Sequence, residues 1–282
     1  MCRKIPVPVV RAIQTRHSVR TFMPRPLTPQ DRDRLAACME QLDNPFGVPV
    51  KVCMLDRQVA PGGEKLGTYG IIQGAGTFLG VSVSDTEMAP VAAGYAFENL
   101  ILEATAMGLG TVWLAATFNR AGFASAMRVP ADALFPAISP VGYPAVRRRL
   151  TESLMRAAMR SSARKRWREL FYEHDFQTPL AELAAGAYAV PLEMLRLAPS
   201  DKNTQPWRVL KVGSRYHFYV THRPGVAREE RIIKQVDAGI ALSHFHQTVL
   251  ELGLKGSFEH RPPVEVACPD NMYYVVSWKM EE

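Results

Sequence analysis

The feature that most limits the fold of this chain is an internal repeat. Residues 90–113 read PVAAGYAFENLILEATAMGLGTVW, and residues 235–258 read QVDAGIALSHFHQTVLELGLKGSF. A constant shift of 145 positions places Ala93 on Ala238, Gly94 on Gly239, Ala96 on Ala241, Gly108 on Gly253 and Leu109 on Leu254. Each copy predicts a helix closed by a Gly-Leu turn, because glycine readily adopts the left-handed conformation that ends a helix. The small residues in the first turns predict close packing against another helix.

The segments on either side of the two helices also correspond. Short extended runs precede the helices at 48–55 and 206–212, and β-rich runs follow them at 135–143 and 272–278. This order predicts an α+β protein made of two related lobes, each a modest antiparallel or mixed sheet with helices packed on it. We assign lobe 1 to residues 1–150, a basic helical connector to 151–178 and lobe 2 to 179–282. Such a chain looks like a fused dimer, so a monomer could be self-sufficient.

Two short motifs lie far apart in the sequence. Lobe 1 contains Arg16-His17-Ser18-Val19-Arg20, and lobe 2 contains Pro199-Ser200-Asp201-Lys202-Asn203, a string that must leave a helix, turn sharply and enter a strand after Pro206. At the corresponding turn, lobe 1 has Leu42-Asp43-Asn44-Pro45-Phe46, without the serine, and residues 176–190 of lobe 2 hold no Arg-X-Ser-X-Arg string.

Together these motifs resemble the nitroreductase family of FMN enzymes, in which each subunit carries both and a homodimer builds two FMN sites from opposite halves. The resemblance is closest to the single-chain, tandem-lobe branch of that family. It extends to the Gly67-Thr68-Tyr69-Gly70 string and to residues 165–171. Because each lobe keeps one motif and lacks the other, the resemblance implies one complete flavin site between the lobes and a second that has decayed.

The resemblance also implies roles for individual residues. Arg16 would bind the FMN phosphate, for which the planar guanidinium offers paired charge-assisted hydrogen bonds. Ser18 would reach the ribityl chain or the pyrimidine edge, and Arg20 would lie near N1 and O2, where a cation stabilises the reduced flavin. His17 would cover the flavin edge or face solvent. Exposed helix-end cations are the alternative for both arginines.

Further positions follow from the same resemblance. At least one of Arg147, Arg148 and Arg149 would join Arg16 at the phosphate. Pro199 and Ser200 would present backbone and hydroxyl groups to the flavin ring, while Asn203 would brace the turn or bond the ring edge. Two sites stay open: the segment that includes Tyr69 is either near the ring or an ordinary turn, and Lys255 and Gly256 either contact the cofactor or merely follow a helix C-cap.

Composition excludes several other classes. The net charge of +7 is local, since residues 147–168 hold nine Lys or Arg, and a solvated basic face is the plain explanation. We therefore expect no specific nucleic-acid partner. No apolar stretch approaches the roughly 20 residues of a membrane span, and the first residues do not have the pattern of a signal peptide, so we expect a cytoplasmic location. Neither the four cysteines nor the pair His244 and His246 has metal-ligand spacing, so no metal is expected.

The predicted function is an NAD(P)H-dependent flavin oxidoreductase that holds FMN and binds NAD(P)H transiently. It would reduce a nitroaromatic, a quinone or a similar conjugated small molecule by a ping-pong cycle. We assign no catalytic side chain, because the cofactor carries the electron chemistry. The chain has no Gly-X-Gly-X-X-Gly fingerprint with an acidic partner, which fits transient nicotinamide binding. The alternative is an FMN-binding module without turnover, for storage or sensing.

Overall fold

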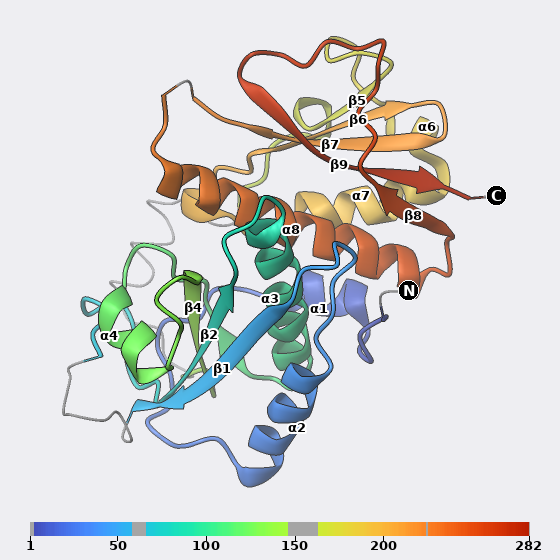
Figure 1. Ribbon diagram of the computed structural model, residues 1–282. Coiled ribbons are helices and arrows are strands. Elements are labelled where there is room, and N and C mark those ends of the chain that lie inside the picture. The colour runs from blue at the N-terminus through green and yellow to red at the C-terminus, as the bar shows by residue number, and fades with distance from the viewer. Residues whose placement is uncertain (1–2, 58–65, 146–162, 224, 282) are drawn as a thin grey trace.

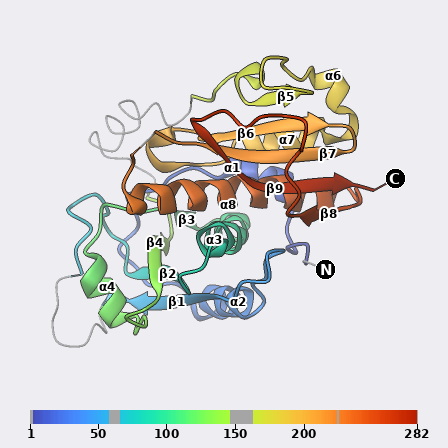
Figure 2. The same cartoon turned by 45° about the horizontal axis from the view of Figure 1, so that its top comes forward.

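The computed structural model describes residues 3–57, 66–145, 163–223 and 225–281. Two sheets lie on opposite sides of a layer of helices, and the two longest helices of the described chain, α3 (Ala89–Ala106) and α8 (Arg228–Glu251), cross in the middle of that layer (Figure 1). Turning the molecule shows α3 nearly end-on beneath α8 (Figure 2). The site described below depends on this crossing.

The first sheet belongs to lobe 1. In the described residues it has four antiparallel strands in the order β1-β2-β4-β3. The strands are β1 (Val50–Asp56), β2 (Thr77–Val83), β3 (Gly110–Thr111) and β4 (Leu134–Gly142). Every residue of β2 is buried, because the strand is paired on both edges and covered by α3. The helices α1 (Val9–Thr15), α2 (Pro29–Glu40) and α4 (Arg120–Ala126) complete the lobe.

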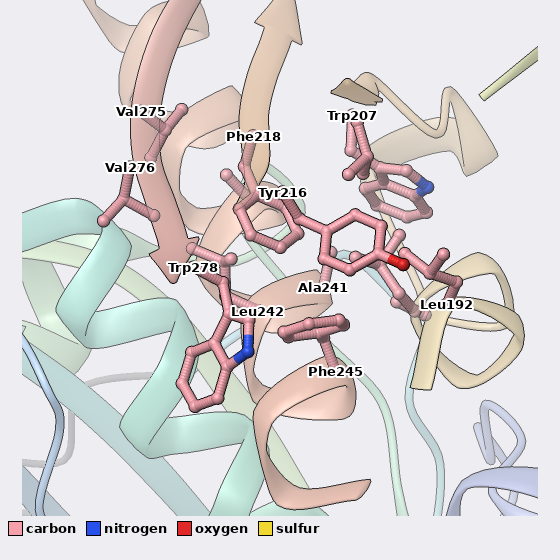
Figure 3. Packing of buried hydrophobic residues seen from close by; sticks show 14 of the residues in the cluster. Leu192, Trp207, Tyr216, Phe218, Ala241, Leu242, Phe245, Val275, Val276 and Trp278 are labelled. Atoms are coloured by element: carbon pink, nitrogen blue, oxygen red, sulfur yellow. The ribbon is translucent and has the colours of Figure 1, made fainter. Parts of the chain in front are cut away.

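The second sheet belongs to lobe 2 and has five described strands in the order β5-β6-β7-β9-β8, with only the β5–β6 pair parallel. They are β5 (Phe171–Glu173), β6 (Trp207–Val212), β7 (Arg215–Thr221), β8 (Gly256–Glu259) and β9 (Met272–Met280). The helices α6 (Glu182–Ala185) and α7 (Ala189–Arg196) and the 3-10 turns η3 (Trp167–Glu169), η4 (Gly186–Tyr188) and η5 (Asp201–Asn203) connect them. Figure 3 shows the aromatic core of the lobe, in which Phe245 of α8 packs among Tyr216, Phe218 and Trp278.

The crossing of α3 and α8 is reciprocal. A Cβ atom on Gly94 would lie 2.2 Å from the Val236 carbonyl oxygen, and one on Gly239 would lie 2.0 Å from the Val91 carbonyl oxygen. Val91 and Val236, like Gly94 and Gly239, are separated by the 145-residue shift of the repeat. Such reciprocal contacts are the geometry of a two-fold interface. The two glycines are present because any side chain would separate the helices.

Much of the predicted architecture is confirmed. The α+β class, the two related lobes, both repeated helices and the four flanking strands are present. Gly108 and Gly253 have φ values of 78° and 68°, as expected for glycines that close helices. Trp207, at the start of β6, is 2% exposed and belongs to the core of lobe 2.

The helical connector needs correction where it is described. Residues 163–178 contain η3 and β5 and no α-helix. Strand β5 pairs with β6, so this segment is part of the second sheet and lobe 2 gathers strands from before residue 179. Leu170 and Phe171 of this segment are both 0% exposed and anchor it in the core of lobe 2. No helix in the described residues combines the length and apolar character needed to cross a bilayer.

Candidate functional site between the two lobes

A cavity of about 290 Å³ lies between the lobes and brings the two distant motifs together. Lobe 1 supplies the segment that follows α1 and the stretch that follows β3. Lobe 2 supplies the turn that follows α7 and one side of α8. The lining residues are Arg16, Ser18, Arg20, Ile71, Val112–Thr117, Pro136, Arg164, Pro199–Asn203, Ile233, Val236, Asp237 and Ile240.

The first motif lies in extended backbone, and this decides which of its side chains reach the cavity. Arg16 ends α1, and the chain then runs beside β3, with the Val19 amide donating to the Thr111 carbonyl at 2.9 Å. Side chains alternate sides in extended backbone. Arg16, Ser18 and Arg20 therefore line the cavity, while Val19 is 5% exposed in the core.

His17 is placed elsewhere. Its ring is exposed, does not line the cavity and lies 3.1 Å from the Thr15 carbonyl oxygen through Nδ1. Of the two positions left open from the sequence, the solvent-facing one is observed. The sequence contains a sign of this position. Arg16, Ser18 and Arg20 stand at every second position, so in an extended segment their side chains share one side and His17 points to the other.

Lobe 2 anchors the helix that precedes the first motif. The Glu251 carboxylate, at the end of α8, accepts from the Val9 amide at 2.7 Å and from the Val10 amide at 2.8 Å. A carboxylate at a helix N-terminus satisfies unpaired amides and suits the helix dipole. The position of Arg16 is thus fixed from both lobes.

The second motif forms a tight turn braced by its own side chains. Lys202 and Asn203 have positive φ values of 48° and 56°. The Gln205 amide donates to Ser200 Oγ at 2.8 Å, and Asn203 Nδ2 donates to the Ala163 carbonyl at 2.9 Å. Pro199, Ser200 and Asn203 all line the cavity. The bracing role considered for Asn203 is observed.

Arg164 is a cavity residue that the sequence reasoning missed. Its guanidinium donates to the Leu197 carbonyl at 3.0 Å and to Asn203 Oδ1 at 3.3 Å. Burial, with the positive charges of Arg16 and Arg196, lowers the pKa of Arg164 to about 10. A signal existed: residues 160–164 read RSSAR, the same Arg-X-Ser-X-Arg spacing as the first motif. We had assigned this stretch to a solvated basic face.

A buried carboxylate lies behind the lobe 1 wall. Glu98 of α3 is 0% exposed, and its Oε2 accepts from the indole nitrogen of Trp113, a cavity residue, at 2.6 Å. Its Oε1 lies 3.9 Å from Arg16 Nε and 2.9 Å from His244 Nε2. His244 also faces the Met194 carbonyl oxygen at 3.0 Å. Glu98 therefore ties Arg16, Trp113 and α8 into one arrangement.

The wall formed by α8 and by residues 112–117 was also missed. These positions are mostly apolar, and nothing in their residue types distinguishes them from core. The repeat carried the needed signal, since the 145-residue shift places Gly110 of lobe 1 on Lys255 of lobe 2. Each lobe has a segment that follows the repeated helix. From the sequence we considered cofactor contact for the lobe 2 segment, at Lys255 and Gly256, whereas the cavity is lined by the lobe 1 segment, at residues 112–117.

Several expected site residues are not brought to the cavity. Tyr69 is 71% exposed, although Ile71 two positions later lines the cavity. Lys255 accepts from the Tyr188 hydroxyl through its carbonyl at 3.0 Å, and Gly256 packs against Trp278, so both lie at the far end of α8. Arg147, Arg148 and Arg149 lie outside the described residues.

Two related α+β lobes that close a small-molecule cavity between them define a nitroreductase-like fold. The family model described as "Putative TM nitroreductase" matches residues 8–249, and the chain belongs to this nitroreductase family. A crystal structure of a "putative nitroreductase" from Thermotoga maritima is similar to 96% of this chain and 93% of that chain, with 20% identity and a TM-score of 0.60.

Other solved structures are similar to about half of the chain. A "Nitroreductase with Bound FMN" from Bacteroides fragilis covers 51% of this chain and 91% of its own, with 17% identity and a TM-score of 0.42. A "Putative NADH dehydrogenase/NAD(P)H nitroreductase" from Parabacteroides distasonis covers 50% and 89%, with 22% identity and a TM-score of 0.42. A comparison with curated proteins gave no match.

Proposed function

We propose that the protein is an FMN-dependent oxidoreductase with one flavin site between its two lobes. It would take reducing equivalents from NAD(P)H and pass them to a nitroaromatic, a quinone or a similar conjugated acceptor by a ping-pong cycle. The observation that carries this proposal is the convergence of Arg16, Ser18 and Arg20 with Pro199, Ser200 and Asn203 on one cavity.

The charges of the cavity fit the anionic groups of FMN. Arg16, Arg20 and Arg164 line the same space, and the Arg16 side chain is only 7% exposed. Burial and, to a smaller extent, the positive charges of Arg16 and Arg196 lower the pKa of Arg164, so its charged form is disfavoured in the cavity. A dianionic phosphate would favour that charged form and accept charge-assisted hydrogen bonds. We assign Arg16 to the phosphate, with Arg164 as a neighbouring positive charge, and Arg20 to the N1 and O2 edge.

The remaining walls fit a flat ring. Two buried aliphatic side chains from each lobe line the cavity: Val112 and Leu114 from lobe 1, and Val236 and Ile240 from lobe 2. Ligand sites of this kind combine apolar walls with a few well-placed polar groups. Ser18 and Ser200 would supply the polar contacts at the ribityl chain and the ring.

Bound flavin would supply hydride transfer, and the side chains would do the rest. They would hold the ring, stabilise its negative charge and limit access of water. No nucleophile is needed, so we assign none. The absence of a dedicated nicotinamide fingerprint agrees with a cycle in which donor and acceptor use one pocket in turn.

The reciprocal crossing of α3 and α8 supports a second part of the proposal. The chain would be an internal pseudo-dimer, able to work as a monomer on a small molecule in the cytoplasm, without a nucleic-acid or membrane partner. Because the two lobes contribute to one cavity, neither lobe alone would hold the cofactor.

An absorption spectrum of the purified protein, followed by anaerobic addition of NADPH or NADH, tests this function. We expect the yellow spectrum of bound FMN, its bleaching by at least one nicotinamide and its return on addition of menadione or a nitroaromatic. A yellow protein that neither nicotinamide bleaches would instead be an FMN-binding module without turnover. A colourless protein that gains no flavin from added FMN would contradict both functions.

A further inference from the structure

Asp237 is an acidic side chain in an otherwise aliphatic wall. It lies on the part of α8 that lines the cavity and is 3% exposed. The neighbouring cavity residues of the same helix are Ile233, Val236 and Ile240. In lobe 1, the position related by the 145-residue shift is Ala92. The carboxyl group is therefore present only in the lobe 2 copy of the repeated helix, where it lines the cavity.

The two oxygens of Asp237 have different surroundings. Oδ1 accepts from the Asp201 amide at 3.0 Å and so ties α8 to the turn that carries Ser200. Oδ2 is buried and has no hydrogen-bond partner among the described residues. A buried carboxylate with one bare oxygen is costly. The protonated acid removes that charge and turns Oδ2 into a donor, for which a ligand in the cavity would be the acceptor.

The groups around Asp237 do not offset its burial. The hydrogen bond from the Asp201 amide lowers the pKa of Asp237, and so does the positive charge of Lys234, whose Nζ donates to Thr204 Oγ1 at 2.7 Å. The Asp201 carboxylate raises it. Burial is the largest effect and raises the pKa to about 8. Tyr273, whose hydroxyl oxygen is buried, also interacts with Asp237, because burial and the Asp237 charge raise the pKa of this phenol while Arg231 lowers it. Burial thus favours the protonated form of Asp237.

We propose that Asp237 is the proton donor of the cavity and gives its Oδ2 proton to the acceptor as that molecule is reduced. The inference rests on the proposed oxidoreductase function and adds the source of the proton. A quinone that receives one hydride, supplied by reduced flavin, needs one further proton to become a hydroquinone. The Asp237 O–H bond breaks, an O–H bond forms on the quinone oxygen, and the carboxylate regains a proton from water.

The matched variants are Asp237→Asn and Glu229→Gln. Asparagine keeps the Oδ1 acceptor for the Asp201 amide and stays neutral, but it has no proton to transfer. Glu229→Gln removes a carboxylate from the exposed first turn of the same helix, away from the cavity. Three properties are measured: the FMN dissociation constant, the rate of each half-reaction by stopped flow with NADPH and menadione, and the thermal midpoint of the apoprotein from pH 5 to pH 9.

We expect Asp237→Asn to bind FMN and to be reduced by NADPH within about twofold of the unmodified protein. Reoxidation by menadione should slow by about 100-fold at pH 7, a loss typical of a general acid. The rate in the unmodified protein should fall above about pH 8, and the variant should show no such fall. Glu229→Gln should behave like the unmodified protein.

The apoprotein gives a test that needs no turnover. A carboxyl whose pKa is higher in the folded state than in the unfolded chain makes stability fall as pH rises between the two values. The thermal midpoint of the unmodified apoprotein should therefore fall from pH 5 to pH 8, and Asp237→Asn should remove that part of the fall. An unchanged reoxidation rate and pH profile in Asp237→Asn would overturn the inference while leaving the oxidoreductase intact. Failure of the unmodified protein to bind FMN would overturn the proposed function, and an apoprotein midpoint insensitive to the substitution would overturn protonation of Asp237.

Discussion

The cavity between the lobes differs sharply from the region that the repeat relates to it. Ile240 and Trp113 line the cavity, and the positions 145 residues away, Tyr95 and Phe258, are packed together with Phe46. Phe46 lies 5.8 Å from the Tyr95 ring centroid and 5.7 Å from that of Phe258, and His246 lies 5.1 Å from Phe258. We call the residues Phe46, Tyr95, His246 and Phe258 the aromatic cluster.

This comparison teaches how a duplicated scaffold can leave one region open and fill the related one. Both regions lie beside the same pair of crossing helices, so the backbone frame is available twice. In one region small and aliphatic side chains leave a space rimmed by arginines. In the other, the rings of Phe46, Tyr95, His246 and Phe258 pack against one another. The occupied region contributes packing energy, while the open one is left for a ligand.

The largest effect should come from the crossing that both regions share. Gly239→Ala places a Cβ atom 2.0 Å from a backbone oxygen of α3 and should lower the free energy of unfolding by about 3 kcal/mol, because overpacking forces the helices apart. Urea unfolding followed by circular dichroism measures the change. Gly76→Ala is the control, since a Cβ there meets no atom within 4 Å. Equal stability of the two variants would show that the glycine contact is not what holds the lobes together.

Copying the aromatic cluster into the cavity should close it. Ile240→Tyr introduces the side chain that lobe 1 has at the equivalent position, Tyr95, and should reduce FMN affinity by about 100-fold or more while the protein stays folded. Fluorescence titration of the apoprotein with FMN gives the dissociation constant. Ile240→Val leaves the space open and is the control. Retention of flavin by the tyrosine variant would place the cofactor elsewhere.

Removing one arginine from the cavity should weaken FMN binding by less than Ile240→Tyr does. Arg16→Ala should cost about 1 to 3 kcal/mol of FMN binding free energy, as expected for charge-assisted hydrogen bonds to phosphate. Arg11→Ala removes an exposed arginine from the same helix and should leave affinity unchanged. The phosphate assignment fails if both variants bind FMN with equal affinity. Riboflavin, which lacks the phosphate, should bind both alike.

Acid should weaken the aromatic cluster. Burial lowers the pKa of His246 to about 4, below its ordinary value of 6.5. The unfolded chain therefore binds more protons between these values, so stability falls as pH drops from about 6.5 towards 4. We expect this histidine to lower the free energy of unfolding by up to about 3 kcal/mol as the pH falls to 4. His217, with a pKa also lowered to about 4, acts in the same direction, so the comparison needs His246→Gln against His217→Gln. If His246→Gln loses as much stability between pH 6.5 and pH 4 as the unmodified protein, His246 does not cause the acid sensitivity.

The smallest effects should come from residues that the structure places away from the cavity. Tyr69→Ala and Lys255→Ala should change FMN affinity by less than about twofold, because neither side chain lines the site. The same titration measures both. A loss of tenfold or more in either would mean that the bound state gathers segments beyond the described cavity.

The sequence was most informative about features that neighbouring residues determine, such as helix ends and strands. The repeated Gly-Leu turns predicted helix ends, and the alternation of short runs predicted strands, because both depend on neighbouring residues. The resemblance to the nitroreductase family predicted that the two polar motifs would meet, and residues of both line one cavity. The position of His17 was left open between the flavin edge and solvent, and the alternation of side chains in the extended segment explains the exposed position that is observed.

Other parts of the site depend on tertiary packing. Arg164 lies in a basic stretch whose charge pattern fits a solvent-exposed helix, whereas its contacts with Leu197 and Asn203 show that it turns inward. Asp237 is an ordinary helix residue in the sequence, and its character comes from burial between α8 and the turn at Asp201. The residues that follow the repeated helix occur once in each lobe, and the sequence alone does not show which of the two segments lines the cavity. The structure shows that residues 112–117 do, and that Lys255 and Gly256 do not.

The ratio of bound FMN to polypeptide tests the central claim most directly. Apoprotein saturated with FMN, freed of excess cofactor and assayed for flavin absorbance and protein mass should hold one FMN per chain. Two per chain would show that the aromatic cluster leaves its region open to flavin, and none would show that residues so far apart in the sequence do not build a flavin site where they meet.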